Sequence, residues 1–550
     1  MAIISFKTYW KLALIFTSLL TVLNTNSQER PNIIYIMADD HCDRAIGVYG
    51  GRLATLNPTP NLDKLAKKAM VFDNVFCTNS ICTPSRATIM TGQYSHVNKA
   101  YDLYTGLPGE KHYLLQEIQQ SGYTTAVVGK WHLRYSPKYA DYFAVIAGQG
   151  SYINPVIHVS EEGEKRNVRF DSTLEKEIEV IDTKGHSSDV LTDISLDWLE
   201  NKREKTKPFF LMHHFKAPHD MFVYADRYKD YLKDVEIPEP QNLYRQPEKH
   251  FGSIATRGKD DTLIDEIGST ISPNSGKKRS LSQIYKRKKK INTEGLSDKE
   301  ITHQVYQLYL KEYLRCVKGI DDNLQRILNY LEQNNLMENT IIVYTSDQGM
   351  FLGEHDFIDK RWMYEESIKM PLIVHYPKMI NSGTRNNWLI NNTDYAPTLL
   401  GLAGIEKPEY MQGESFVDAL KGEREPKDWR KATYYRYWMH MAHKHNNPAH
   451  FGIRTKKYKL IFFYGADYTN IHNNQIVEDK NGNRYWHDTP AAWEFYDLEK
   501  DPNEMVNQFE NPKYSDIISE LKTELFRIRE EVGDTDEEFP RIKAIVETYK

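Results

Sequence analysis

The chain has 550 residues, of which 40% are hydrophobic and 27% are charged, with a formal net charge of −5 at pH 7. This composition is typical of a soluble globular enzyme, and the slightly acidic balance excludes a general attraction to nucleic acid. Four cysteines are too few for a disulfide scaffold, and the length predicts two domains or one large domain with a smaller satellite.

The first 27 residues have the pattern of a secretory signal peptide. Lys7 and Lys11 supply positive charge, residues 12–23 are apolar, and a polar stretch with small residues follows. The apolar run is short for a membrane span, although an uncleaved anchor is the alternative interpretation. Since no second hydrophobic span follows, we expect an exported protein, periplasmic or secreted, without stable membrane insertion.

Four apolar runs predict strands that are buried on both faces of a sheet. They cover 32–38, 123–130, 209–215 and 340–346, and they do not alternate polar with apolar residues. Patterns typical of helices lie between them, the longest from about 301 to 333. This alternation predicts an α/β fold with a large, mostly parallel or mixed central sheet and helices on both faces.

The segment from 237 to 296 interrupts this rhythm, because it is polar and rich in turn-forming residues. It holds eight basic residues between Lys277 and Lys290. Two interpretations stay open: a solvated insertion loop, or a basic rim that attracts a polyanionic substrate.

The C-terminal part has a different pattern. Short aromatic runs at 433–438 and 459–464 predict strands, and 515–532 predicts a closing amphipathic helix. We therefore expect a smaller α+β domain with an antiparallel sheet. The expected organisation is a signal peptide over 1–27, a catalytic domain over 28–430 and a C-terminal subdomain over 431–550.

Polar side chains follow two of the predicted strands. Asp39 and Asp40 come after the first strand, and Asp347 and Gln348 come after the fourth. Open α/β sheets place their sites at the carboxyl ends of strands, and oxygen ligands of this kind suit calcium. No cluster of histidines or thiolates competes for a softer metal. The alternative interpretation is simple capping of strand ends by acidic residues.

Cys82 opens the segment 82–86, which reads C-T-P-S-R. Taken alone, Cys82 would be a core thiol or a disulfide partner of Cys77, and we expect Cys42 and Cys316 to be buried thiols. The pattern C-x-P-S-R is the signature of the type I sulfatases of the alkaline phosphatase superfamily, and the chain resembles that family over most of its length. The resemblance implies that a maturation enzyme oxidises Cys82 to formylglycine (3-oxoalanine), whose hydrated aldehyde attacks the sulfur of a sulfate ester.

The resemblance also implies a calcium site. Its ligands would be Asp39, Asp40, Asp347, Gln348 and the modified Cys82. The fourth of these positions is often asparagine in the family, so a glutamine there is a departure. Arg86 is expected to hold the alkoxide of the modified residue.

Further cations follow from the same resemblance. Lys130 and His132, in G-K-W-H-L, would contact the nucleophile and the sulfate, and His219, in K-A-P-H, would contact sulfate and protonate the leaving alcohol. Lys360 would bind sulfate. His355 is expected to face the same cleft, with a structural role as its alternative.

Other histidines have no assigned chemistry. His440, His443, His445 and His450 lie among aromatic residues, which suits carbohydrate binding, although a structural role is equally compatible with the pattern. His213 and His214 are expected to be strand residues.

These features together predict a calcium-dependent sulfatase that acts on a sulfated poly- or oligosaccharide. The alternatives are a phosphoester or phosphonate hydrolase of the same superfamily and a non-catalytic glycan-binding homologue.

Overall fold

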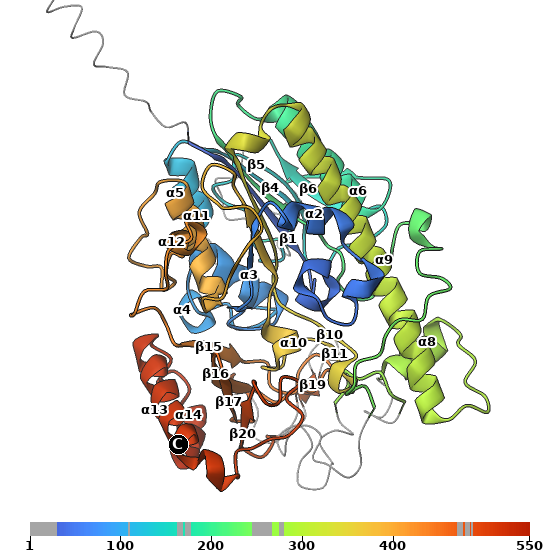
Figure 1. Ribbon diagram of the computed structural model, residues 1–550, viewed down its shortest axis with the longest axis vertical. Coiled ribbons are helices and arrows are strands. Elements are labelled where there is room, and N and C mark those ends of the chain that lie inside the picture. The colour runs from blue at the N-terminus through green and yellow to red at the C-terminus, as the bar shows by residue number, and fades with distance from the viewer. Residues whose placement is uncertain are drawn as a thin grey trace, which may run out of the picture.

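Figure 1 shows the computed structural model of the chain. It describes residues 30–107, 111–161, 169–170, 178–244, 267–273, 280–469, 477–478, 484–485 and 488–550. The predicted signal peptide and the first part of the basic stretch, 277–279, lie outside the described residues. Within these ranges, no helix combines the length and the apolar character needed to cross a bilayer.

A ten-stranded sheet forms the centre of the molecule, in the order β13-β2-β12-β9-β1-β8-β4-β5-β6-β7. Its central strands run parallel to one another and are β9 (Thr340–Ser346), β1 (Asn32–Ala38), β8 (Phe209–His214), β4 (Thr124–Lys130) and β5 (Tyr142–Ile146). Antiparallel pairs join β12 (Leu372–His375) to β9 and to β2 (Met70–Phe72), and β6 (Val156–Ser160) to β5 and to β7 (Glu179–Asp182). The edge strand β13 (Thr384–Asn386) is parallel to β2. The predicted mixed sheet is confirmed.

Helices cover both faces of this sheet, which explains the unbroken apolar strands. Ile33, Tyr35 and Met37 of β1 belong to one core cluster, and Ile34 and Ile36 belong to another. The first face is covered by α3 (Cys82–Thr91), α5 (Leu114–Gln120) and α11 (Tyr395–Leu402), and the second by α2 (Pro60–Ala66), α6 (Ser187–Asp197) and α9 (Asp298–Gln333). Figure 1 shows the two groups of helices on opposite sides of the sheet.

The longest helix, α9, begins three residues before the predicted start at about residue 301. Ser297 caps its first turn, and the side chain of Glu300 bonds back to the backbone N–H of Ser297. Such a reciprocal capping box satisfies two backbone groups that a helix start otherwise leaves unpaired.

A second, four-stranded sheet lies in the C-terminal part. It is antiparallel, in the order β15 (Ala432–Tyr437), β16 (His450–Thr455), β17 (Tyr458–Phe463) and β20 (Ala492–Asp497). One face packs against α13 (Ser515–Glu531) and α14 (Pro540–Tyr549), and the other contributes side chains to a core of the large sheet. The predicted antiparallel sheet with a closing helix is confirmed.

The remaining elements are short. They are β3 (Val75–Phe76), α4 (Ser95–Asn98), β10 (Phe351–Leu352), β11 (Ile358–Asp359), α10 (Glu365–Ile368), β14 (Ile390–Asn391), α12 (Val417–Leu420), β18 (Val477–Glu478) and β19 (Arg484–Tyr485).

The described part of the segment 237–296 differs from a solvated loop. It contains the helix α8 (Leu281–Lys288), which packs on α9 and buries Leu281 and Tyr285. The stretch ahead of α8 lies along β11, since the backbone of Ser269 accepts a hydrogen bond from Ile358 N–H at 2.8 Å. Apolar residues at helical spacing therefore anchor this segment, although its polar composition hides them.

Candidate active site

The carboxyl ends of four neighbouring strands meet at one edge of the central sheet. Ala38 of β1 pairs with Ser346 of β9, and His214 of β8 is level with both Met37 of β1 and Gly129 of β4. The residues that follow these strands therefore emerge side by side. Gly129 allows this close approach, because a Cβ atom there would lie 1.8 Å from the carbonyl oxygen of His214.

Three carboxylates are buried together at this edge. Asp39, Asp40 and Asp347 are each 0% exposed, and one oxygen from each lies within 4.8 Å of the others. The backbone N–H of Asp40 donates to Asp347 Oδ1 at 3.1 Å, which ties the two strand ends together. Burial raises the pKa of Asp347 to about 7, and the neighbouring Asp39 adds to the shift.

Gln348 completes this group. Its Nε2 donates to Asp40, whereas its Oε1 is buried without a hydrogen-bond partner among the described residues. Three carboxylates and an unpaired amide oxygen thus lie close together in a buried place. The donor set therefore fits a hard divalent cation that takes oxygen ligands.

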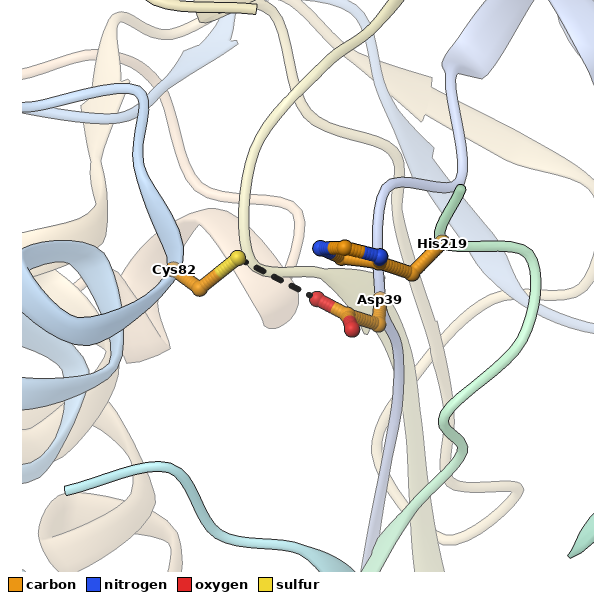
Figure 2. Close-up of side chains that lie close together, drawn as sticks. All are labelled: Asp39, Cys82 and His219. Atoms are coloured by element: carbon orange, nitrogen blue, oxygen red, sulfur yellow. Dashed lines mark hydrogen bonds between the residues drawn. The ribbon is translucent and has the colours of Figure 1, made fainter. Parts of the chain in front are cut away.

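Cys82 faces the carboxylates from the other side. It is the first residue of α3 and is 1% exposed, and its Sγ lies 3.6 Å from Asp39 Oδ1. Figure 2 shows Cys82, Asp39 and His219 converging from three segments on one space. All four cysteines are free, so the disulfide alternative with Cys77 is wrong. Burial raises the pKa of the Cys82 thiol, which leaves it protonated and a weak nucleophile.

The rest of the segment 82–86 fixes Cys82 against the strand ends. Arg86 is 2% exposed; its Nε donates to Asp347 Oδ2 at 2.9 Å, and its guanidinium lies 3.3 Å from Asp39 Oδ1. Thr83 donates its hydroxyl hydrogen to the backbone oxygen of His132 at 2.9 Å. One helical turn is thus bonded to the residues that follow β1, β9 and β4.

Two lysines from different segments pair with the aspartates. Lys130 contacts Asp39 and also donates to Gln149 Oε1 at 2.7 Å, while Lys360 donates to Asp40 Oδ2 at 2.6 Å. Burial alone would raise the pKa of Asp39, but Lys130 holds it well below its usual range. Burial raises the pKa of Asp40 to about 6 despite Lys360.

Both predicted histidines lie beside these charges. His219 Nε2 is 3.8 Å from Asp40 Oδ2, and its Nδ1 is 2.5 Å from the backbone oxygen of Asp220. Burial and Lys130 hold the pKa values of His219 and His132 well below the usual range. An anion bound next to His219 would raise its pKa, because a negative charge favours the protonated ring.

His355 differs from the expectation that it faces the cleft. Its ring stacks on Tyr364 at 5.2 Å, and its Nε2 lies 3.9 Å from Glu366 Oε2. It is 2% exposed, within the aromatic packing behind β10 and β11. Its place is that of a structural histidine, which was the alternative interpretation.

A cavity of about 640 Å³ opens over Cys82, His219 and Lys360. Sequence reasoning assigned no role to several residues that line it, namely Gln149, Tyr152, Lys216, Asp220, Asp359 and Arg361. Lys216 stands three residues before His219, and Asp359 and Arg361 flank Lys360, so proximity to the expected residues was the available signal. Gln149 and Tyr152 follow β5, a strand that the apolar pattern did not predict.

The four histidines of the C-terminal part lie in two different environments. His443 and His445 line the cavity, whereas His440 and His450 are fully buried. His450 stacks on Tyr435 and Trp362 inside the core. His213 and His214 are strand residues of β8, as expected.

Comparisons with known proteins agree along most of the chain. The family model described as Sulfatase matches residues 31–405, and the model described as N-sulphoglucosamine sulphohydrolase, C-terminal, matches residues 353–481 and 483–531. The chain is 36% identical to an N-acetylglucosamine-6-O-sulfatase of Bacteroides thetaiotaomicron, over 94% of this chain and 90% of that protein.

Two solved structures are informative. One was determined in complex with its substrate D-glucosamine-2-N,6-O-disulfate; it has a TM-score of 0.77 and 34% identity, covering 93% of this chain and 99% of that one. A phosphonate monoester hydrolase from Silicibacter pomeroyi shares the fold, with a TM-score of 0.63, 18% identity, and coverage of 91% and 96%.

Proposed function

Because the chain belongs to the type I sulfatase family of the alkaline phosphatase superfamily, we propose that this sulfate ester hydrolase removes the 6-O-sulfate of a glucosamine-type sugar. The observation that carries the proposal is the meeting of Cys82, at the start of α3, with three buried carboxylates at the base of α3, while Cys82 also lines a cavity that contains cationic side chains. The N-acetylglucosamine-6-O-sulfatase that is 36% identical supports the choice of sugar and of sulfate position.

The same reading assigns two cofactors. We infer that Cys82 is converted to formylglycine and that Asp39, Asp40, Asp347 and Gln348 hold Ca²⁺. When present, the modified residue supplies a nucleophilic hydroxyl and the calcium ion neutralises negative charge on the sulfate. The protonated, buried thiol supports a modified residue as the nucleophile, because the unmodified side chain is inert at neutral pH.

The residues of the chain would then bind and orient the ester. Lys130 contacts Asp39 and Lys360 contacts Asp40, and both would supply positive charge to a bound sulfate. His219 is placed to donate a proton to the leaving alcohol, and His132 lies beside Lys130. Arg86 holds Asp39 and Asp347 in position and adds a permanent positive charge beside residue 82.

Export belongs to the proposal as well. The N-terminal pattern and the sulfated carbohydrate substrate both suit a periplasmic or secreted enzyme, with residues 28–430 carrying catalysis and 431–550 forming the C-terminal subdomain. A formylglycine-generating enzyme is the implied maturation partner.

The test is sulfate release from defined sugars, using protein whose conversion at residue 82 has been verified by mass. We expect release from glucosamine 6-O-sulfates and none from sugars sulfated at other single positions. A Cys82→Ala variant should lose turnover and keep substrate binding. Nitrophenyl sulfate and nitrophenyl phosphate assays run in parallel address the phosphonate hydrolase that shares the fold. Dominant activity on the phosphate would overturn the proposal.

A further inference from the structure

The cavity contains a lysine that the chemistry above does not use. Lys216 follows β8, three residues before His219, and lines the cavity with Cys82 and Lys360. Only 4% of its surface is exposed. Its ammonium lies 4.7 Å from the centre of the Tyr152 ring.

The partners of Lys216 set it apart from the other two lysines of the site. Lys130 and Lys360 each contact an aspartate. The ammonium of Lys216 makes no hydrogen bond and no ion pair with any residue in the described part of the chain; it lies over the face of Tyr152, and Asp39 and Asp220 attract it only from a longer distance. An aromatic face compensates only part of the loss of water around an ammonium group.

A buried charge without a paired carboxylate is costly, so its position favours binding of an anion. Burial lowers the pKa of Lys216 to about 8, and the nearby Lys130 adds to the shift. The side chain therefore remains largely protonated at neutral pH and offers three N–H donors to the cavity. The positive charge of Lys216, its N–H donors and its position in the cavity together suit the binding of an anion.

We propose that Lys216 is a substrate-binding residue whose ammonium donates to a sulfate group of the bound sugar. This inference rests on the proposed function, because that function fills the cavity with a sulfated ligand. It adds a cation beside Tyr152, in the same cavity that Lys360 lines. Two sources of the sulfate share this chemistry: the ester that is cleaved, or a second sulfate on the same sugar.

The experiment compares Lys216→Met with Lys216→Arg and with a surface control, Lys229→Met. Methionine keeps the length of the side chain and removes its charge, whereas arginine keeps the charge. Lys229 is exposed on the segment that follows and has no role in the site. Binding is measured by calorimetry in a Cys82→Ala background, so that no turnover occurs. The ligands are inorganic sulfate, glucosamine 6-O-sulfate and glucosamine-2-N,6-O-disulfate. Kinetics are measured with the formylglycine enzyme.

We expect Lys216→Met to weaken binding roughly 10- to 100-fold, the usual value of a hydrogen bond to a charged group. A loss for all three ligands assigns Lys216 to the ester sulfate. A loss confined to the disulfate assigns it to the second sulfate and appears as a raised KM on that substrate alone. Lys216→Arg should recover much of the binding, and Lys229→Met should match the parent protein.

The stability of the ligand-free protein gives an independent test, because the substitution that weakens binding should increase stability. Since Lys216→Met removes a buried charge that has no paired carboxylate, it should raise the melting temperature of the ligand-free protein by roughly 2–4 °C. A purely structural lysine would give the reverse. Unchanged affinity for all three ligands would overturn the inference even if the parent enzyme is an active sulfatase. A parent that releases no sulfate would defeat the proposed function, while the binding data would still decide the role of Lys216.

Discussion

At the scale of single residues, the notable feature is the burial of three carboxylates close together. Lys130 and Arg86 lie beside Asp39, Lys360 lies beside Asp40 and Arg86 lies beside Asp347, yet burial still raises the pKa values of Asp40 and Asp347. Carboxylates that crowd one another in the absence of water destabilise the fold unless positive charge balances them. The proposed divalent cation would supply that charge.

Calcium should consequently stabilise the folded protein. Binding to the native state alone adds roughly 3 kcal/mol when calcium is at one hundred times its dissociation constant, which is visible as a rise in melting temperature. Asp347→Asn should abolish most of that rise, because it removes one of the three carboxylate ligands. The exposed Asp234→Asn is the matched control and should retain it. An equal calcium response in both variants would show that the ion binds elsewhere.

The sequence predicted the residues that meet at the strand ends better than the residues that line the cavity. Asp39 and Asp347 were predictable because each ends an unmistakable buried strand, and Cys82 because its motif is specific. His355 was misplaced, since only the packing of Tyr364 and Phe351 around it shows that the ring turns away from the cavity. The sequence did not indicate a role for Lys216, because it does not show which residues surround the side chain in the folded protein.

At the scale of elements, α8 combines two opposing tendencies. Its apolar side packs on α9, and its C-terminal end carries the exposed run from Lys286 to Lys290. Lys289 pairs with Glu312 at 2.7 Å, which neutralises one of these charges. The helix thus presents a fixed cluster of positive charge to solvent.

We expect this cluster to attract long sulfated chains. Changing Lys286, Lys288 and Lys290 to glutamine should raise KM for a polymeric substrate a few-fold at low ionic strength, because it removes a long-range attraction for the polyanion. Salt weakens this attraction, since it screens exposed charges beyond about 10 Å at 0.1 M. The effect should vanish at high salt and for a monosaccharide substrate.

The control for this experiment removes the same charge elsewhere. Glutamine at the exposed positions Lys427, Lys431 and Lys513 should leave KM unchanged at every salt concentration. Kinetics of the α8 variant that do not respond to ionic strength would reject the role.

Element prediction succeeded best for the seven-residue strands buried throughout. The runs that form β1 and β9 were bounded correctly, because a strand covered on both faces needs apolar residues throughout. The shorter strand β5 was missed although it is buried throughout. Strands β6 and β7 near the sheet edge were missed because β6 mixes exposed and buried residues and β7 has no buried residue. Helix α8 was missed because charged residues outnumber the few that anchor it.

At the scale of the whole molecule, a buried polar network joins the two sheets. Glu365 of α10 binds Arg454 of β16 at 3.0 Å and Lys459 of β17 at 2.9 Å. Nearby, Glu494 of β20 accepts hydrogen bonds from Tyr364 at 3.0 Å and from Tyr496 at 2.9 Å. Buried polar contacts therefore bind the C-terminal sheet to α10 and to Tyr364, which precedes it.

This network makes stability depend on pH. Burial raises the pKa of Glu494 from 4.5 to about 8, so between these values the unfolded chain releases a proton that the native state retains. Stability should fall as pH rises through this range, by about 1.4 kcal/mol per pH unit for this one group. Glu494→Gln removes the ionisation, so the stability of this variant relative to the parent protein should increase between pH 5 and pH 8. Melting temperatures measured at both pH values test this.

The comparison needs a control for general charge effects. Glu520 lies exposed on α13, and Glu520→Gln should follow the parent protein at both pH values. A constant difference between Glu494→Gln and the parent would mean that Glu494 is already ionised in the folded protein.

The hydrogen bond between Asp40 and Asp347 spans 307 positions of the chain. A ribosome that adds about 5–20 residues per second needs roughly 15–60 s to cover that interval. A nascent chain that has not reached β9 cannot bring its three carboxylates together. Cys82 and Gln348 are 266 positions apart, so the thiol stays outside the closed site for roughly 13–53 s of that interval. If a maturation enzyme oxidises Cys82, as proposed, this is the time it has before β9 completes the centre of the sheet.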